Sequence, residues 1–269
     1  MISLYNSKPQ LDNLYFDVSQ LNESEIKQFI EDGYVIARNV FSRNLAKDIR
    51  TSFKEDIKEQ NQNLNQDSLF LIHKKVYYNE NISKIFTQKY IEIINELCGL
   101  GRWEFDKGIG YWFISYPDKN KSVWQPVQSA WHIDSNTKQH TLNSKLGLLA
   151  FHLFTDILPG GGGTAVRIGS HKYSARILEK AGAQGLSELD FSRQAVKTTS
   201  HLPFTEITGQ CGDVLFMHPL TVHTRSSNIL NRTRIVGHKF FHLFEPMNLN
   251  RQDFLENSPI ETSIVKALE

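Results

Sequence analysis

The sequence has few cysteines and no long apolar run. Its two cysteines, Cys98 and Cys211, are far apart among 269 residues, so they fit neither a disulfide framework nor a C-x-x-C metal site. No stretch of about 18 apolar residues occurs, so no transmembrane helix is expected. The first ten residues are polar and lack the apolar region of a secretory signal. We therefore expect a cytoplasmic protein with no membrane partner.

The sequence also lacks an excess of positive or negative charge. The 30 Lys and Arg residues are balanced by 29 Asp and Glu residues, which leaves a formal net charge of +1. Nucleic-acid-binding proteins normally carry a marked basic excess, so we expect no nucleic-acid partner. A length of 269 residues, with 40% hydrophobic and 22% charged residues, fits one large globular domain. The sequence does not indicate an oligomeric state.

The N-terminal part of the chain has helical periodicity. Asn22 precedes a helix that is predicted to run to about Asp32, where Gly33 ends it. Residues 34–37 then read as a strand. Two further helices are predicted, and an exposed Asn/Gln-rich loop lies between them; the ranges are 43–60 and 82–97 for the helices and 60–66 for the loop.

The rest of the chain consists of short β-rich runs broken by Gly, Pro and Asn, which favours an antiparallel sandwich or barrel. We predict a single domain over residues 1–269, mainly β, in which the largely helical residues 1–100 support a jelly-roll core at 101–245. Residues 174–203 are a partly helical insertion, and 246–269 are a C-terminal tail. The candidate strands are 109–115, 129–133, 148–154, 164–168, 213–217, 221–223 and 234–243.

His132 and Asp134, together with a distant His223, supply two imidazoles and one carboxylate. This ligand set, the facial triad, binds non-heme Fe(II) on one face and leaves the opposite coordination positions open. On a strand, residues i and i+2 project from the same face, so His132 and Asp134 can reach one metal ion. The spacing therefore predicts an iron site.

Two histidines compete for the third ligand position. His223 lies at the end of an apolar run, whereas His218 precedes a proline and is a plausible turn or strand-entry residue. The sequence favours His223. Five more histidines have no ligand spacing to this group and are expected to be ordinary surface or core residues: His140, His152, His201, His238 and His242.

Arg234 begins a β-rich run, where a buried arginine is costly unless it is paired. Its planar guanidinium suits a bidentate partner such as the distal carboxylate of a small diacid. An internal salt bridge is the alternative explanation. Arg232 is the local competitor, but it lies closer to the preceding loop and is expected to be solvated.

In the order of its motifs, the chain resembles the phytanoyl-CoA dioxygenase family of Fe(II)- and 2-oxoglutarate-dependent oxygenases. Residues 25–40, EIKQFIEDGYVIARNV, are similar to the helix, Gly-Tyr and strand with which the family begins. The resemblance covers most of the chain. The later motifs are residues 131–134, 154–156, 159–164, 169–171, Gly212-Asp213, His218-Pro219, His223, Asn228 and Arg234.

The resemblance implies a double-stranded β-helix in which His132, Asp134 and His223 bind Fe(II). It also implies that Arg234 anchors 2-oxoglutarate by its distal carboxylate, with O2 as the oxidant. Halogenating relatives replace the carboxylate ligand by Ala or Gly, so Asp134 favours hydroxylation. Weaker candidates for the cosubstrate pocket are Thr164, Gln128, Ser226, Tyr111 and Ser115.

The chain departs from the family at Arg225, because many relatives have a small hydroxyl residue two positions after the last histidine ligand. Either Thr224 or Ser226 takes over that contact, or Arg225 faces the substrate. The candidate substrate residues are Trp112, Trp131, Arg225 and His171, although His171 fits a structural hydrogen bond equally well. Five aromatic residues are candidates for the wall of an apolar cavity, with ordinary core packing as the alternative: Trp112, Phe113, Trp124, Trp131 and Phe151.

The implied function is hydroxylation of an unactivated C–H bond of a small molecule, with release of succinate and CO2. Desaturation, cyclisation and epimerisation are alternatives, because the placement of the substrate relative to the iron decides among them. A non-catalytic metal- or small-molecule-binding protein is the alternative from another class.

Overall fold

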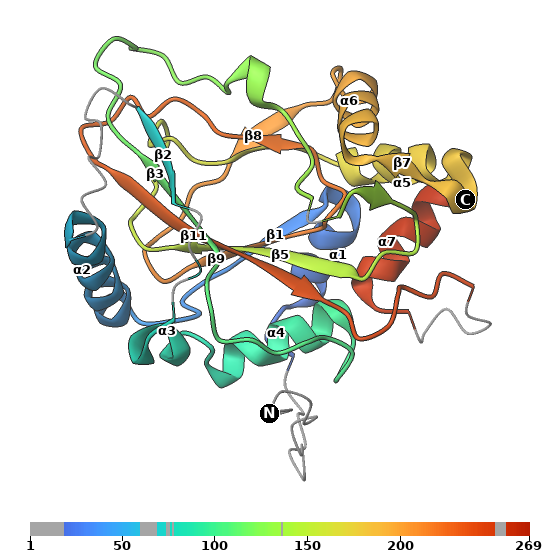
Figure 1. Cartoon of the computed structure of the whole chain (residues 1–269), viewed down its shortest axis with the longest axis horizontal. Coiled ribbons are helices and arrows are strands. Elements are labelled where there is room, and N and C mark those ends of the chain that lie inside the picture. The colour runs from blue at the N-terminus through green and yellow to red at the C-terminus, as the bar shows by residue number, and fades with distance from the viewer. Residues whose placement is uncertain (1–18, 60–68, 74–75, 77, 136, 251–256) are drawn as a thin grey trace.

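A six-stranded antiparallel sheet crosses the centre of the molecule in the computed structural model (Figure 1). The structure describes residues 19–59, 69–73, 76, 78–135, 137–250 and 257–269, so the predicted loop at 60–66 lies outside the described residues. In spatial order the strands are β1 (Tyr34–Ala37), β9 (Val214–Met217), β5 (Leu146–Leu153), β11 (Arg234–His242), β3 (Tyr111–Ser115) and β2 (Phe70–His73).

Two smaller antiparallel sheets complete the β structure. One has the order β10 (His223–Thr224), β6 (Ala165–Arg167) and β8 (Phe204–Glu206). The other pairs β4 (Gln139–His140) with β7 (Leu186–Ser187). The chain is thus a mixed α/β structure with antiparallel sheets.

Helices surround the sheets. They are α1 (Glu23–Asp32), α2 (Arg43–Glu59), α3 (Glu80–Lys84), α4 (Gln88–Cys98), α5 (Ser170–Ala181), α6 (Glu188–Thr198) and α7 (Pro259–Leu268). Two 3-10 turns, η1 (Gln128–Ala130) and η2 (Gly182–Gln184), lie in the connections. In Figure 1, α3 and α4 lie on one side of the large sheet and β8 lies on the other. No described helix combines the length and the apolar character that crossing a membrane requires.

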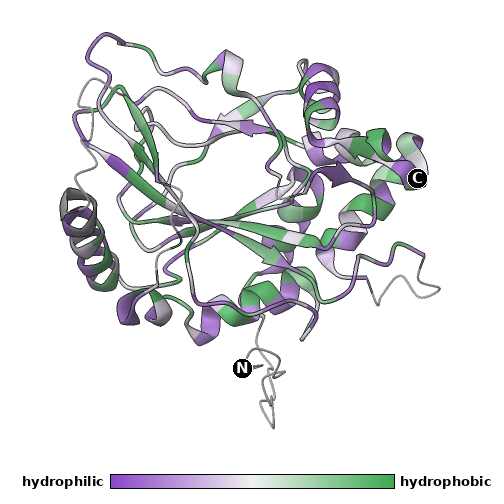
Figure 2. Cartoon of the chain, in the orientation of Figure 1, coloured by the Kyte–Doolittle hydropathy of each residue, from purple (hydrophilic) through white to green (hydrophobic). Residues whose placement is uncertain are grey.

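The central strands β5 and β9 are buried on both faces, and Figure 2 shows that the central strands of the large sheet are rich in apolar residues. Successive side chains of a strand point to opposite faces. Accordingly, Leu148 and Ala150 of β5 join the apolar core on the helical side. Leu149 and Phe151 instead join a second apolar cluster, which includes Val166 of the three-stranded sheet. The space between the two sheets is therefore lined by alternate residues of each strand.

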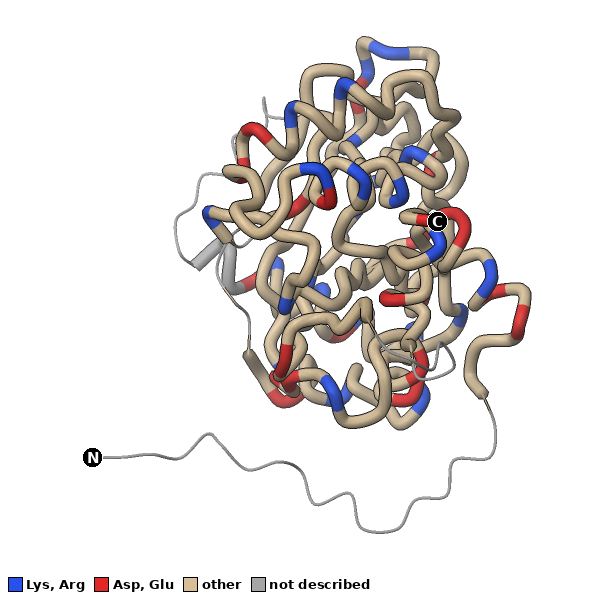
Figure 3. Tube along the Cα trace, turned by 90° about the vertical axis from the view of Figure 1, so that its right-hand side faces the viewer, with Lys and Arg blue, Asp and Glu red and all other residues tan. Residues whose placement is uncertain are grey.

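The first helix and strand are confirmed. Asn22 caps α1 with a full capping box, because its side chain accepts a hydrogen bond from the backbone N–H of Glu25 while the Glu25 side chain accepts one from the Asn22 backbone. Gly33 ends the helix in the left-handed region, with φ 84°. In the chain trace of Figure 3, Lys and Arg are interspersed with Asp and Glu.

Three sequence predictions differ from the structure. The helix predicted at 82–97 is two helices, because Thr87 caps a new helix by accepting from the N–H of Tyr90. The strand predicted at 129–133 is the 3-10 turn η1 followed by a single bridge at His132. The segment 246–269 is more than a tail, since it contains α7, whose buried Ile260 and Ile264 join the main core.

Candidate metal centre

His132 and His223 face each other across an isolated antiparallel bridge. Each backbone N–H donates to the carbonyl oxygen of the other residue at 3.0 Å. This closed pair brings the two imidazole rings to a centroid separation of 4.4 Å. One strand pairing therefore places two residues that are distant in sequence side by side. His218, the competitor for the third ligand position, lies outside this pair, and its Nδ1 accepts from the N–H of Leu220.

Backbone carbonyls fix the tautomer of both rings. Nδ1 of His132 lies 2.8 Å from the carbonyl oxygen of Ala130, and Nδ1 of His223 lies 3.0 Å from that of Thr221. A carbonyl oxygen only accepts, so both Nδ1 atoms carry the proton. In the neutral rings each Nε2 is then left with a lone pair, which is the form in which histidine binds a metal.

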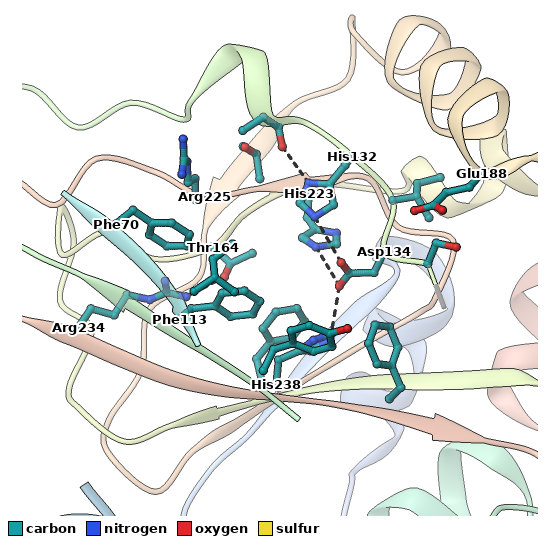
Figure 4. Close-up of a pocket in the computed structure, with 18 residues that line it drawn as sticks. Phe70, Phe113, His132, Asp134, Thr164, Glu188, His223, Arg225, Arg234 and His238 are labelled. Carbon is teal, nitrogen blue, oxygen red and sulfur yellow. Dashed lines mark hydrogen bonds and ion pairs between the residues drawn. The ribbon is translucent and has the colours of Figure 1, made fainter. Parts of the chain in front are cut away.

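The Asp134 carboxylate completes the group. Its Oδ1 lies 3.3 Å from Nε2 of His132, and its Oδ2 lies 3.3 Å from Nε2 of His223. The three donor atoms all lie within 4.8 Å of one another. Figure 4 shows the three side chains turned toward one another. Three electron-pair donors that converge in this way repel one another unless a cation lies between them. The residues present therefore fit a divalent metal ion.

The charge state of Asp134 agrees with this. Burial alone would raise the pKa of the Asp134 carboxyl, but the neighbouring imidazoles of His223 and His238 hold it well below its ordinary value. Burial opposes protonation of His132, yet its contact with Asp134 raises its pKa overall. Asp134 is thus an anion at neutral pH, as a metal ligand must be.

Arg234 is buried at the same pocket, and its Nη2 donates to the Oγ1 of Thr164 at 2.9 Å. Among the described residues its Nε has no hydrogen-bond partner, and no carboxylate forms an ion pair with it. Burial lowers its pKa to about 10, so it remains a cation at neutral pH. The nearby Glu206 does not neutralise it by direct contact, because its carboxylate accepts from the N–H groups of Gly160 and Gly163. Within the part of the chain that the structure describes, Arg234 therefore does not form the internal salt bridge that was considered for it.

These groups line one pocket of about 480 Å³ between the sheets, a volume within the usual range for small-molecule sites. His132, Asp134, His223, Arg234, Thr164, Tyr111 and Arg225 all line it. Of the expected aromatic wall, Phe113 and Phe151 are present and three tryptophans are not. Thr224 is also in the lining, and Arg225 is exposed, with its guanidinium 4.8 Å from the ring centroid of Phe70.

Several predicted site residues lie outside the lining because their side chains point elsewhere. Gln128 is exposed on η1 and accepts from the indole N–H of Trp131, which is itself covered by the guanidinium of Arg167. Trp112 points to the helical face of β3, where it stacks on Phe53 and Phe154. Trp124 donates its indole N–H to Ser226.

Three smaller residues are displaced from the lining in the same way. Ser226 also donates to the carbonyl oxygen of Gly163, so its hydroxyl is fully engaged. His171 is buried under α1, with Nε2 3.0 Å from the carbonyl oxygen of Ile30. Ser115 pairs with Arg234 in the β3–β11 ladder but does not reach the pocket.

Two titratable lining residues, His238 and Glu188, were not predicted from the sequence. His238, expected to be an ordinary histidine, is buried with its Nε2 3.4 Å from Asp134 Oδ2, and burial lowers its pKa to about 4. A signal was available, since His238 lies on the same face of the strand as Arg234. Glu188 begins α6 within the predicted insertion and lines the same pocket, on the opposite side from Arg225 in Figure 4. No sequence signal places Glu188 there.

Comparisons with known proteins show similarity at the level of structure. No protein-family model matches the chain, and no curated protein matches it by sequence. Among solved structures, the non-heme alpha-ketoglutarate-dependent carbocyclase SnoK from nogalamycin biosynthesis is similar with a TM-score of 0.56 and 17% identity, over 82% of this chain and 84% of that one.

Two other solved structures are similar over comparable lengths. EctD from S. alaskensis, in its apoform, has a TM-score of 0.54 and 13% identity, over 85% of this chain and 79% of its own. HygX from Streptomyces hygroscopicus, solved with nickel and 2-oxoglutarate bound, has a TM-score of 0.51 and 14% identity, over 82% of this chain and 87% of its own. The chain therefore shares the fold of these proteins.

Proposed function

We propose that this protein is an Fe(II)- and 2-oxoglutarate-dependent oxygenase that oxidises an unactivated C–H bond of a small molecule. The observation that carries the proposal is the convergence of the His132, Asp134 and His223 donor atoms in one pocket with Arg234, a buried cation without a carboxylate partner among the described residues. A metal ion between the three donor atoms and an anionic cosubstrate at Arg234 would account for both features. The proteins that share the fold, SnoK and HygX, are named for or solved with 2-oxoglutarate.

In this proposal His132, Asp134 and His223 hold the iron. The hydrogen bonds from Nδ1 of the two histidines to backbone carbonyl oxygens keep the Nε2 atoms in place. Arg234 and the hydroxyl of Thr164 bind the distal carboxylate of 2-oxoglutarate. When bound, the metal and cosubstrate supply the oxidation, in which O2 converts 2-oxoglutarate to succinate and CO2 and oxidises the substrate. Aromatic residues such as Phe113 and Phe151 keep water from the reacting groups.

The finer assignments are also proposals. We infer that the large and three-stranded sheets are the two faces of a double-stranded β-helix, and that the chain is a member of the phytanoyl-CoA dioxygenase family. Hydroxylation is the proposed outcome, because the carboxylate ligand Asp134 is retained. Ring formation, the reaction for which SnoK is named, is the second outcome that the same site supports. A product heavier by one oxygen atom supports hydroxylation, and a product lighter by two hydrogens supports desaturation or cyclisation.

The test is an anaerobic titration of Fe(II) and 2-oxoglutarate, followed by optical absorption, on the wild type and on Arg234→Ala. We expect a visible metal-to-ligand band in the wild type. Loss of a buried, hydrogen-bonded charge partner costs about 2–5 kcal/mol, so Arg234→Ala is expected to bind 2-oxoglutarate at least about 30-fold more weakly. Arg232→Ala is the matched control, because Arg232 is exposed and does not line the pocket.

A wild-type protein that binds Fe(II) but gives no band with 2-oxoglutarate would contradict the proposal. In that case the non-catalytic binding protein becomes the better explanation of the site. Equal weakening by both arginine variants would show that general charge, and not the buried guanidinium, attracts the cosubstrate.

A further inference from the structure

His238 approaches the candidate metal centre from the large sheet. Figure 4 shows His132 and His223 on one side of the Asp134 carboxylate and His238 on the other. Nε2 of His238 lies 3.4 Å from Asp134 Oδ2. Both atoms are buried, and neither makes a hydrogen bond within the part of the chain that the structure describes. Each atom therefore lacks a partner that the other can supply.

Aromatic neighbours hold the His238 ring in this orientation. Phe151 stacks on it at a centroid distance of 4.3 Å, and Phe240 meets it edge-on at 4.6 Å. Phe113 closes the frame at 5.9 Å. These three rings offer neither a conventional donor nor a conventional acceptor to Nε2, which lies 3.4 Å from the Asp134 carboxylate. The ring of Tyr111 is further away, at a centroid distance of 6.1 Å.

The geometry does not make His238 a further metal ligand. The donor atoms of His132, Asp134 and His223 all lie within 4.8 Å of one another, and His238 is outside that set. Its contact is with the carboxylate and not with the other imidazoles. A group that touches one ligand of a metal site from outside is placed to orient that ligand.

We propose that His238 is a positioning residue for Asp134: its Nε2–H donates to Oδ2 and holds the carboxylate in place for metal coordination. This inference rests on the proposed function of the triad as an iron site. A carboxylate that coordinates a metal keeps further lone pairs, and burying them without a donor is costly. A contraction of a few tenths of an ångström brings the 3.4 Å contact to the ordinary hydrogen-bond distance of about 2.9 Å.

The experiment is a titration with Co(II) alone, followed by calorimetry and by the d–d absorption of the bound ion. His238→Phe keeps the aromatic packing and removes the donor, and we expect it to bind Co(II) about 10- to 100-fold more weakly than the wild type. His238→Gln retains an N–H donor and is expected to recover most of this loss. His242→Phe, which removes an imidazole from the same strand outside the pocket, is expected to bind as the wild type does.

The outcomes separate this inference from the proposed function. A wild type that binds no Co(II) overturns the proposed function and this inference with it. Normal wild-type binding that His238→Phe leaves unchanged overturns only the role of His238. If His238→Phe and His238→Gln lose Co(II) affinity equally, the positioning role of His238 is also overturned. A changed d–d spectrum in these variants would then indicate that His238 binds the metal directly. Unfolding temperatures of the metal-free proteins report folding separately, and His238→Leu replaces His238→Phe if that variant does not fold.

Discussion

At the residue scale, Asp134 is the side chain that connects the candidate centre, because its carboxylate contacts His132, His223 and His238. His132 and His223 each have a backbone hydrogen bond at Nδ1, and the His238 ring is packed among aromatic rings, whereas the Asp134 carboxylate contacts these three imidazoles and, in the proposed function, the metal. The centre is therefore most sensitive to the loss of Asp134. His238 matters because it is one of the three residues that contact this carboxylate.

We predict that Asp134→Ala abolishes succinate formation. The variant removes the only charged ligand from the set, so the two remaining imidazoles bind Fe(II) more weakly. The measurement is succinate released from 2-oxoglutarate in the presence of Fe(II) and O2, with Asp48→Ala on the exposed face of α2 as the control. Wild-type rates of succinate formation in Asp134→Ala would rule out the triad as the iron site.

At the scale of elements, Gly33 joins α1 to β1 in a place that accepts no side chain. Its φ is 84°, and a Cβ there would lie 2.5 Å from Nδ1 of the buried His171. Gly101 is a matched control, since its φ is 66° and a Cβ would meet nothing within 4 Å. We expect Gly101→Ala to lose about 1 kcal/mol of unfolding free energy, the cost of the left-handed conformation, and Gly33→Ala to lose clearly more. Denaturant unfolding measures both, and equal losses would show that the structure at His171 gives way easily.

The α7 helix depends on a buried carboxylate. Glu261 forms a bidentate ion pair with Arg102, and it accepts from the backbone N–H groups of Asn248 and Ser258. Burial alone would raise the pKa of Glu261, but these donors lower it to about 2. α7 is thus tied to the segment that follows α4.

This arrangement predicts an acid-sensitive contribution to stability. Because the folded pKa of Glu261 is below the ordinary value of 4.5, its stabilisation is present above about pH 4.5 and is lost as the pH falls towards 2. We expect Glu261→Gln to cost about 3 kcal/mol at pH 7 and progressively less below pH 4.5. Unfolding of both proteins between pH 7 and pH 2 tests this, and a difference that is independent of pH would contradict it.

The elements that the sequence predicts well are those whose signals are local. The capping box at Asn22 and the glycine at position 33 set the bounds of α1, and a run rich in β-branched and aromatic residues indicates β11. The break at Thr87 and the helix α7 were missed, because the first interrupts a continuous apolar pattern and the second follows a polar segment. The structure brings His132, Asp134 and His223 together as expected. The strand expected at His132 is only one bridge, because its pairing with His223 is a tertiary contact that no local pattern reveals.

At the scale of the whole molecule, the pocket is shared between the sheets. Arg234 and His238 come from the large sheet, whereas His223 begins β10 of the three-stranded sheet and Thr164 directly precedes β6. A metal ion and 2-oxoglutarate bound there would connect the two layers. Ligands that bind the folded state alone stabilise it by mass action.

We therefore predict that Ni(II) and 2-oxoglutarate raise the unfolding temperature in two separable steps. A ligand at about 100 times its Kd contributes about 2.7 kcal/mol, and each kcal/mol corresponds to about 2–4 °C in a protein of this size, so each step is expected to be about 5–10 °C. Thermal unfolding of three proteins distinguishes the steps. The wild type is expected to show both, Arg234→Ala only the metal step, and Asp134→Ala neither. A full 2-oxoglutarate step in Asp134→Ala would mean that the cosubstrate binds without the metal, and the two halves of the pocket would then act independently.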